Sequence, residues 1–373
     1  MRPFLFLVAF LTAISTVYAR GSFGADQPQT TPVSATLSVF DISSGKAKTL
    51  FTLDDQSLSA PAFAGRNVFV ATSGKKVLAI DSKTGHINWE YTTNHPVFSL
   101  LTASKEVYVG AGATLLALDP RTGTVRWSFD NDMALTDPAP ADGLVTFNSV
   151  DGPIAMDPAT GKTRWRLNVQ WGYFICSALS DHRLCVWKPD EIYVIDTESG
   201  KTLWQSAADS SVSAPGALPS PAVAAGEVIC QLRGSRTDPR DWSIFNLDAG
   251  SGKTLWKTNL GDHLGAAART LISGNTVYCV LDENLFALDL KTGEKKWRAS
   301  TKPLETNGTG MTADANTIVL PQIGGNLLAL DAETGKQRWL DESSAPSRKN
   351  IMRTAGMVIT TDSVYVARNE FAR

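Results

Sequence analysis

Short apolar runs alternate with polar turns along almost the whole chain, and the runs come in pairs around one kind of turn. The apolar run Val77–Ile80 is followed by Asp81, three variable residues and Gly85, and a second run ends in Trp89. An Asp side chain accepts hydrogen bonds from backbone N–H groups of its own turn, and Gly takes the positive φ that closes such a turn. The pattern therefore predicts a β-hairpin with a connection that starts with Asp and ends with Gly.

The same fragment, D-x-x-x-G-x-x-x-W, recurs along the chain. Its complete copies are Asp81–Trp89, Asp119–Trp127, Asp157–Trp165, Asp196–Trp204, Asp248–Trp256, Asp289–Trp297 and Asp331–Trp339. A further copy, Asp41–Gly45, lacks the Trp and has Leu50 and Phe51 near its place. A repeat of ~40 residues is the length of a four-stranded propeller blade. The repeat thus predicts one blade per copy.

The two ends of the chain carry complementary halves of a blade. The first repeat has only the outer two strands, Leu37–Phe40 and Ala47–Leu53, whereas the last has only the inner two, Gly356–Thr360 and Val364–Ala367. Joining the halves removes exposed strand edges. We therefore predict an all-β fold, an eight-bladed β-propeller of four-stranded blades whose ring is closed by a composite N-/C-terminal blade.

The recurring Trp residues lie on the predicted outermost strands, where a large ring can pack against the next blade. We expect blade docking by Trp89, Trp127, Trp165, Trp204, Trp256, Trp297 and Trp339. Two residues before the Asp, five copies have Ala, which leaves room for such a ring: Ala79, Ala117, Ala155, Ala287 and Ala329.

The copies that read A-x-D-x-x-T-G-x-x-x-W, such as Ala117–Trp127 and Ala329–Trp339, resemble the repeats of the pyrroloquinoline quinone (PQQ)-type propellers. The resemblance covers roughly Leu37 to Phe371. It implies one of two functions: a quinoprotein dehydrogenase, which holds the quinone over the centre of the propeller, or a non-catalytic propeller similar to the BamB subunit of the outer-membrane β-barrel assembly machinery. BamB-like propellers are lipoproteins anchored through a Cys at the cleavage site. The first Cys here is Cys176, so we expect no lipid anchor of that kind.

The N-terminal residues have the pattern of a signal peptide: Arg2, an apolar core from Phe4 to Ile14, and then Val17-Tyr18-Ala19. We expect cleavage after Ala19, a flexible lead-in over residues 20–36 and a single propeller domain over residues 37–373. The predicted location is secreted or periplasmic. A formal net charge of −2 gives no electrostatic reason to expect nucleic acid or an anionic membrane as partner, and no later segment is apolar enough to span a bilayer.

Catalytic and metal-binding motifs find little support in the residues. The PQQ-dependent dehydrogenases typically use adjacent cysteines, and the cysteines here are separate: Cys176, Cys185, Cys230 and Cys279. The first two flank one predicted turn, so they form either a cross-strand disulfide or two buried thiols; Cys230 and Cys279 are expected in the core. The histidines lack metal-ligand spacing, and we expect them on the surface: His86, His95, His182 and His263. The repeated Asp residues are interpreted as turn residues. We therefore predict no catalytic, cofactor-binding or metal-binding residue and no bound cofactor.

The repeat is broken between Asp196 and Asp248, where the interval is 52 residues. The insertion Arg233–Trp242 is rich in Arg, and in a propeller it lies on the face that also carries the connections between blades. Arg and Trp are enriched at protein interfaces, although each Trp could instead pack within its own loop. The predicted partner-binding residues are Trp171, Tyr173, Arg233, Arg236, Arg240 and Trp242. We interpret the chain as a monomeric module that binds another protein or a peptide segment; a quinoprotein oxidoreductase with an atypical cofactor site is the alternative.

Overall fold

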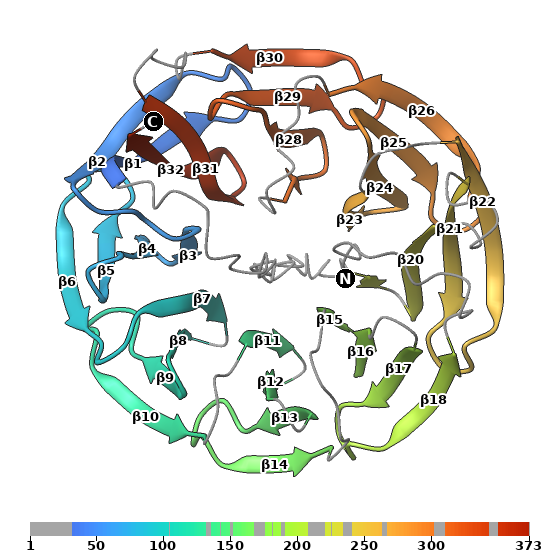
Figure 1. The fold of residues 1–373 in the computed structure, drawn as a ribbon, viewed down its shortest axis with the longest axis horizontal. Helices are drawn as coiled ribbons and strands as arrows, with labels where there is room; N and C mark the ends of the chain where they lie inside the picture. The colour runs from blue at the N-terminus through green and yellow to red at the C-terminus, as the bar shows by residue number, and fades with distance from the viewer. Residues whose placement is uncertain are drawn as a thin grey trace, which may run out of the picture.

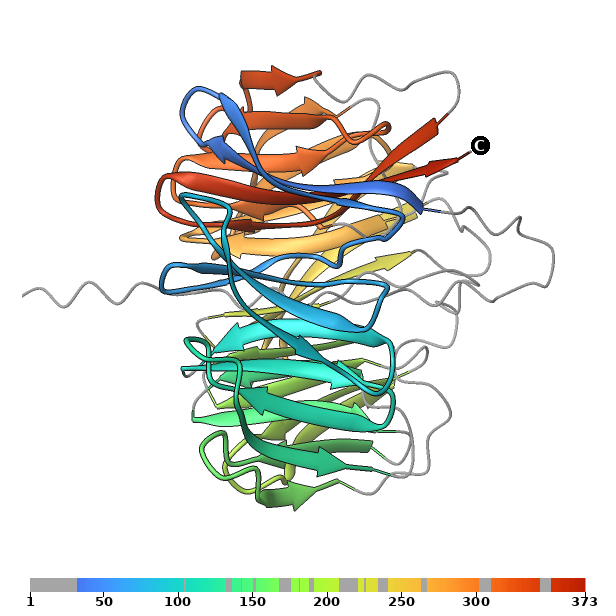
Figure 2. The same ribbon diagram turned by 90° about the vertical axis from the view of Figure 1, so that its left-hand side faces the viewer.

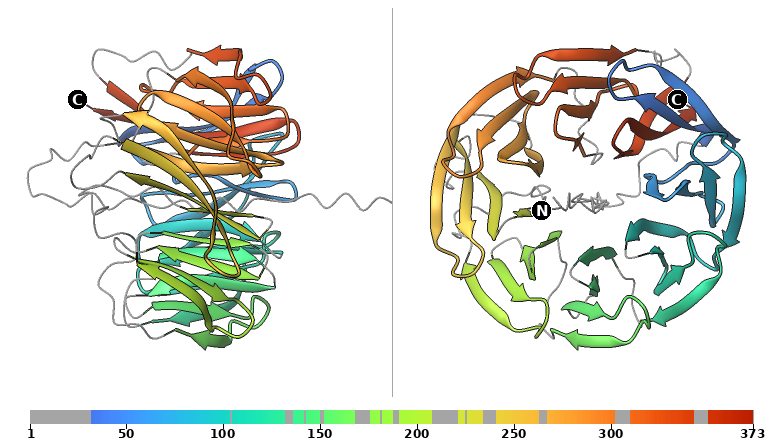
Figure 3. Two further views of the ribbon diagram at one scale, coloured as in Figure 1. Left: turned by 90° about the vertical axis from the view of Figure 1, so that its right-hand side faces the viewer. Right: turned by 180° about the vertical axis from the view of Figure 1, so that it is seen from behind.

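The computed structural model is a closed ring of eight four-stranded antiparallel sheets, as predicted (Figure 1). It describes residues 32–103, 105–131, 136–141, 143–149, 152–167, 176–180, 182–187, 191–207, 221–224, 226–233, 241–262, 267–301, 310–342 and 350–372. The first strand of each blade lies toward the middle of the ring and the fourth forms the outer edge (Figures 1 and 3).

Seven blades are continuous in sequence, and we number them in chain order. Blade 1 contains β3 (Ala62–Ala64), β4 (Asn67–Ala71), β5 (Lys76–Asp81) and β6 (Ile87–Thr92). Blade 2 contains β7 (Val97–Ala103), β8 (Glu106–Ala111), β9 (Thr114–Leu118) and β10 (Val125–Asp130). Blade 3 contains β11 (Thr136–Ala141), β12 (Leu144–Ser149), β13 (Gly152–Met156) and β14 (Thr163–Arg166). Blade 4 contains β15 (Cys176–Ser180), β16 (Arg183–Trp187), β17 (Glu191–Asp196) and β18 (Thr202–Ala207).

The remaining blades complete the ring. Blade 5 contains β19 (Ala222–Ala224), β20 (Glu227–Arg233), β21 (Asp241–Asp248) and β22 (Thr254–Asp262). Blade 6 contains β23 (Ala267–Ser273), β24 (Thr276–Leu281), β25 (Asn284–Asp289) and β26 (Lys295–Ser300). Blade 7 contains β27 (Thr312–Ala313), β28 (Thr317–Pro321), β29 (Leu327–Asp331) and β30 (Gln337–Asp341). Blade 8 is the composite one, with β31 (Asn350–Ile359) and β32 (Ser363–Ala372) from the C-terminal end and β1 (Pro32–Asp41) and β2 (Ala47–Asp54) from the N-terminal end.

The composite blade joins the two ends of the chain through the pairing of β1 with β32 (Figure 1). The pairing runs from Pro32 opposite Phe371 to Asp41 opposite Ser363, so both strands are longer than the sequence predicted. Residues 32–36 were expected in the flexible lead-in, and that boundary is wrong. Within this segment Ala35 is buried and Val33 is exposed, and Ser34 Oγ donates to Glu370 Oε2 of β32 at 2.8 Å. A mostly polar segment can thus form a strand that is buried on one side.

The hydrophobic core is divided among the spaces between consecutive blades. Phe69 of β4, for example, packs with Val107 and Val109 of β8 in the next blade. The second strand of a blade lies between two neighbouring blades, and every residue of β4 and β8 is buried. The outer strands alternate between half-buried and exposed residues, as β6 does, because only one of their faces meets protein. Blade-to-blade burial of apolar surface is thus the main source of stability for the ring.

The repeat fragment connects each blade to the next one. In the fragment of blade 2, Gly123 closes the turn with a φ of 73°, and its N–H donates to the Asp119 carbonyl at 2.9 Å. The Trp89 ring of blade 1 lies directly over Gly123: a Cβ built there would be 2.6 Å from Trp89 Cε3. Trp89 Nε1 also donates to the carbonyl of Pro120 at 3.1 Å. The turn therefore needs Gly for two reasons, its φ and the close approach of the ring.

All seven docking Trp residues have this arrangement. The indole N–H groups donate to carbonyl oxygens of the following blade at 2.6–3.2 Å: Trp89 to Pro120, Trp127 to Pro158, Trp165 to Thr197, Trp204 to Ala249, Trp256 to Leu290, Trp297 to Ala332 and Trp339 to Ile42. Five of them stand directly across the strand pair from the small residue of the repeat, as Trp127 stands opposite Ala117. At the junction from blade 8 to blade 1, which lacks a Trp, the Leu50 backbone takes the place over Gly85.

Candidate functional site

The blade topology gives the ring two faces that carry different connections between strands, and Figure 2 presents the ring edge-on. The turns between first and second strands and between third and fourth strands lie at one end of each blade, because the strands are antiparallel. We call this the hairpin face. The connections between second and third strands, and those between blades, lie at the opposite end, which we call the linker face.

Four of the six predicted partner-binding residues lie outside the described residues: Trp171, Tyr173, Arg236 and Arg240. Arg233 is the last residue of β20 and pairs with Trp242 of β21. Trp242 also pairs with Gly261 of β22 and is only 5 % exposed, packed in a cluster with Ile229 and Leu260. The prediction that Trp242 offers a contact on the rim is therefore wrong. Strand β21 begins one residue before it, so the ring enters the blade interior instead of the loop.

The carboxylates of the repeat are bound within their own turns. Asp81 Oδ1 accepts hydrogen bonds from the backbone N–H groups of Lys83 and Thr84, at 3.0 and 2.9 Å, and from Thr84 Oγ1 at 2.9 Å. These bonds lower the pKa of Asp81 to about 2, with the Thr84 backbone bond as the largest cause. A Ser or Thr hydroxyl makes the same bond in most other copies, including Ser44, Thr160 and Ser199.

In five copies of the repeat, Oδ2 of the Asp forms an ion pair with a basic side chain. The pairs are Arg66 with Asp81, Arg126 with Asp119, Arg164 with Asp157, Lys296 with Asp289, and Arg338 with Asp331, at 2.6–3.3 Å. In four of these pairs the base directly precedes the docking Trp. Blades 4 and 5 have Leu203 and Leu255 there, and both are more than 40 % exposed. The repeat carboxylates therefore serve the turns and the ion pairs of the ring.

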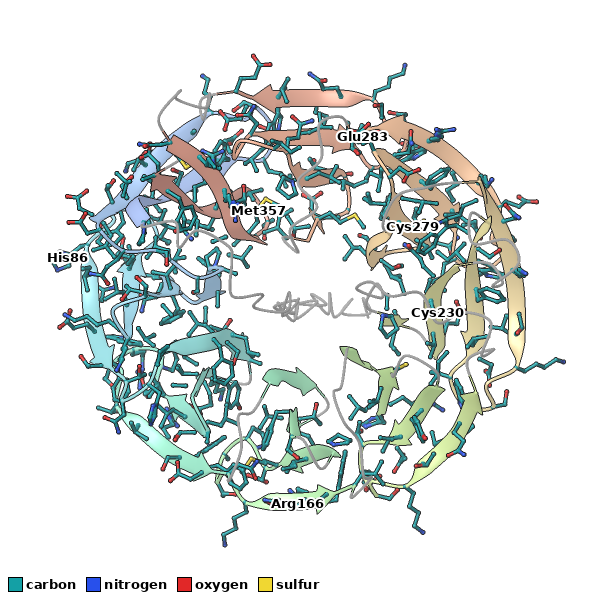
Figure 4. The ribbon with its side chains drawn as sticks, in the orientation of Figure 1. His86, Arg166, Cys230, Cys279, Glu283 and Met357 are labelled. Atoms are coloured by element: carbon teal, nitrogen blue, oxygen red, sulfur yellow. The ribbon has the colours of Figure 1, made fainter. Side chains whose placement is uncertain are left out.

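The remaining candidate groups are dispersed. Cys230 and Cys279 are buried inside neighbouring blades, where desolvation raises the pKa of each thiol to about 12 (Figure 4). A cross-strand disulfide would require Cys176 and Cys185 at facing positions. Cys176 instead stands opposite Trp187, and Cys185 stands opposite Ala178. His86 lies exposed at the outer edge of the ring, and His95 and His182 are exposed as well (Figure 4). His263 lies outside the described residues. Within the described ranges, no group of three or more His, Cys, Asp or Glu could hold a metal ion.

A hollow of about 730 Å³ opens on the hairpin face between blades 1 and 2. It is lined by Ala64, Gly65, Arg66, Asn67, Asp81, Asn88, Lys105, Asp119, Pro120, Arg121 and Arg126. We call it the blade 1–2 groove. Arg66 comes from the β3–β4 turn, Lys105 from the β7–β8 turn and Arg121 from the β9–β10 turn.

The floor of the groove is a connected set of hydrogen bonds. Asn88 Nδ2 donates to Asn67 Oδ1 at 2.7 Å, and Asn67 Nδ2 donates across the blade boundary to the Pro120 carbonyl at 3.0 Å. The same carbonyl accepts the bond from Trp89. Because both amides are engaged with fixed partners, the floor is held in one geometry by the docking of blade 2 on blade 1.

Basic side chains outnumber acidic ones in the groove lining. Four bases, Arg66, Lys105, Arg121 and Arg126, stand against the two carboxylates Asp81 and Asp119. The Arg66 and Arg121 side chains are 76 % and 87 % exposed, and Arg121 Nε is 4.0 Å from its nearest carboxylate oxygen. Arg121 can therefore turn toward a partner freely, whereas Arg66 holds Asp81 Oδ2 through Nη2 at 3.0 Å and has its remaining N–H groups available at the surface.

Arg126 links the groove to a buried carboxylate beneath it. Its guanidinium lies 2.6 Å from Asp119 Oδ2 and 3.2 Å from Glu106 Oε2, and the Glu106 side chain is 5 % exposed. Desolvation raises the pKa of Glu106, and the charge of Arg126 opposes that shift. Arg126 is thus held by two carboxylates of its own blade. The accessible charges of the groove are then Arg66, Lys105 and Arg121.

The groove does not follow from the repeat pattern alone. A comparison of equivalent repeat positions could have found it, because the second residue after the repeat Asp is basic in only three copies, at Lys83, Arg121 and Lys291. Of these, only Arg121 comes directly after a blade whose own first turn carries an Arg, Arg66. The concentration of charge arises from residues in different repeats, so the pattern within one repeat does not show it.

The family model for the outer membrane protein assembly factor BamB matches residues 21–128, 150–257 and 242–371. No curated protein matches the sequence significantly. Among solved structures, BamB from Moraxella catarrhalis is similar with a TM-score of 0.61 and 15 % identity, covering 91 % of this chain and 98 % of that one.

Two other similar structures have different origins. The computationally designed Ika8 protein has a TM-score of 0.66 and 18 % identity, with 85 % of this chain and 96 % of that one covered. The quinohemoprotein alcohol dehydrogenase from Comamonas testosteroni has a TM-score of 0.54 and 15 % identity, with 90 % and 76 % covered. At these identities the likeness concerns the fold.

Proposed function

The chain belongs to the family of the outer membrane protein assembly factor BamB, and on this basis we propose that it is a non-enzymatic propeller that binds another protein or a peptide segment. The observation that supports the proposal best is the use of the repeat residues. Each repeat Asp that could suggest acid–base chemistry accepts bonds from its own turn, and each repeat Trp docks the next blade. Exposed Arg side chains such as Arg66 and Arg121 are in turn suited to recognition of a partner.

The location proposed for this activity is secreted or periplasmic. It rests on the signal-peptide pattern that ends at Ala19, which lies outside the described residues, as does the predicted cleavage site. Nowhere in the described ranges is there a helix with the length and apolar character of a membrane span. Fractionation of the native host, followed by N-terminal sequencing of the mature protein, tests both the location and cleavage after Ala19.

The proposed contact surface on the linker face consists of Arg233, Arg236 and Arg240 of the insertion together with Trp171 and Tyr173. Trp242 is omitted because it is buried in blade 5. Guanidinium groups pair with carboxylates and stack on aromatic rings, so the surface suits an acidic or aromatic segment. The test is the double variant Arg236→Ser/Arg240→Ser in a pull-down from native extract, with Lys291→Ser/Lys336→Ser on the hairpin face as the charge-matched control. We expect the first variant to lose a partner that the wild type and the control retain; equal recovery by all three overturns this assignment.

The second candidate function is a PQQ-dependent oxidoreductase, which the fold similarity to a quinohemoprotein alcohol dehydrogenase supports. The residues fit this function less well. The chain has no adjacent cysteines, and Cys230 and Cys279 are enclosed in blade interiors. The experiment is incubation of the purified protein with PQQ and Ca²⁺, followed by desalting, absorbance measurement and a dye-linked alcohol oxidation assay. Retained quinone absorbance with alcohol-dependent dye reduction would establish the oxidoreductase and reject the binding-module proposal.

A further inference from the structure

We propose that the blade 1–2 groove is a second binding site, on the face opposite the insertion, and that it takes an extended acidic peptide segment. This inference rests on the proposed function as a binding module, but it does not depend on the Arg233–Arg240 surface. The two sites lie at opposite ends of the blades, so a protein that uses both would hold two partner segments at once.

The positions of the charges favour a peptide with spaced carboxylates. Arg66, Lys105 and Arg121 come from three different turns, and Asp81 and Asp119 stand among them. A compact anion with several charges at one point would meet these carboxylates as well as the bases. A chain with separated carboxylates can place one beside each base and keep the others away from Asp81 and Asp119, so it gains attraction without the matching repulsion.

The shape and rigidity of the groove agree with this ligand. A volume of about 730 Å³ lies within the usual range for sites that hold a small ligand or a short segment. Its floor of Asn67, Asn88 and the Pro120 carbonyl is fixed by blade docking. On the protein, binding therefore orders only the exposed side chains at the rim, which limits the protein's part of the entropic cost.

The overall charge of the protein argues against a polyanion such as nucleic acid. The formal net charge is −2, so the surface as a whole does not attract a long polyanion. The attraction is confined to the groove, and a ligand gains from it only over a short stretch of carboxylates. Its strength should fall with salt, since exposed pairs are screened over about 8 Å at physiological ionic strength.

The experiment measures the binding of fluorescein-labelled hexaglutamate to the purified mature protein by anisotropy at low ionic strength. The test variant is Lys105→Asn/Arg121→Ser, which removes two groove charges; Asn tolerates the positive φ of 76° at position 105. The control is Lys75→Asn/Lys291→Ser, which removes two charges elsewhere on the ring by the same substitutions, and Lys75 also has a positive φ, of 63°. Hexalysine and inorganic pyrophosphate serve as ligand controls.

We expect the wild type and the control variant to bind hexaglutamate equally, and the groove variant to bind it about tenfold more weakly, as the loss of two exposed ion pairs implies. Hexalysine should not bind, and pyrophosphate should not compete at equal total charge. The proposal is overturned if the wild type does not bind, if both double variants weaken binding alike, or if pyrophosphate displaces the peptide and so identifies a phosphate site. Because the assay needs no native partner, its failure leaves the linker-face proposal standing.

Discussion

Arg368 and Asn369 are consecutive residues of β32, and their side chains fasten the composite blade to its two different neighbours. Arg368 Nη2 lies 2.6 Å from Asp341 Oδ2 at the end of β30 in blade 7, and its guanidinium stacks over the Phe40 ring at 5.0 Å. Asn369 forms two bonds with the backbone of Leu58, just before blade 1, at 2.7 and 2.9 Å. Successive side chains of a strand point to opposite faces, so one dipeptide locks both sides of the closing blade.

The Arg368–Asp341 pair is almost entirely buried, with side chains 6 % and 9 % exposed. Replacing Arg368 with Met should remove the guanidinium charge from the Asp341 carboxylate in a dry interface and lower the free energy of unfolding by about 3–5 kcal/mol. The control is Lys76→Met, which breaks an exposed pair with Glu90 and should cost at most about 1 kcal/mol. Urea unfolding measures both. Equal, small losses would mean that the buried pair does not hold the closure.

Opening the composite blade should destabilise the whole ring. A mature chain that starts at Asp55 lacks β1 and β2, so β32 loses its partner strand and Trp339 loses the Ile42 carbonyl that accepts its N–H. We expect a lower melting temperature and self-association through the exposed edge of β32. Calorimetry and light scattering, compared with a chain that starts at Pro32, measure the two effects. A truncated protein that stays monomeric and melts like the longer one would contradict the closure.

The docking rings and Trp242 should be of similar importance to stability. Trp127→Ala and Trp297→Ala each remove a large ring from a blade junction and should cost about 3–5 kcal/mol. Trp242 is 5 % exposed against 9 % for Trp127, so Trp242→Ala should cost a comparable amount despite its place at the end of an insertion. Leu255→Ala, at a side chain 49 % exposed, is the control and should cost much less. A small loss at Trp242 in urea unfolding would argue against its burial.

Two glycines with the same backbone conformation separate strain from close approach. Gly123 and Gly143 both have a φ of 73°, but a Cβ at Gly123 would overlap the Trp89 ring, whereas none of the described atoms lies within 4 Å of a Cβ at Gly143. Gly143→Ala should cost about 1–2 kcal/mol, from φ alone. Gly123→Ala should cost at least about 1 kcal/mol more, because the ring must move. If thermal unfolding gives equal losses, the contact with Trp89 is not tight.

The lowered pKa values of the turn carboxylates predict that the free energy of unfolding decreases in acid. The pKa values of Asp41, Asp81 and Asp331 are lowered from 3.8 to about 2, mainly by hydroxyl bonds from Ser43, by the Thr84 backbone and by Arg338, respectively. A carboxyl group whose pKa is lower in the folded than in the unfolded protein stabilises the folded state. This contribution is complete above the unfolded pKa and is lost as the pH falls from about 4 to about 2. Urea midpoints should therefore decline across this window, and Asp331→Asn should reduce the decline. An unchanged slope in that variant would show that Asp331 does not contribute.

The sequence by itself determined the architecture of this protein, because the determining interactions are local and repeated. An Asp that binds its own turn, a Gly with positive φ and a Trp at a fixed distance specify a hairpin wherever they occur, as in Asp119–Trp127. The blade count and the shared terminal blade followed from repetition of that hairpin and from the half-repeats at the ends. The longer strands of the composite blade did not follow, because residues 32–36 extend β1 between β2 and β32, and β32 comes from the far end of the chain.

Only the tertiary structure decided which side chains are accessible and which of them meet. Trp242 looks like an interface residue in sequence, but the register of β20, β21 and β22 carries its ring into the core. Cys176 and Cys185 flank one turn, yet the strand register separates them by two positions. Arg66 and Arg121 belong to different repeats, and the docking of Trp89 on the turn of blade 2 brings them to one groove. Accessibility and proximity depend on the packing of one blade against the next, and a pattern within a single repeat does not contain that information.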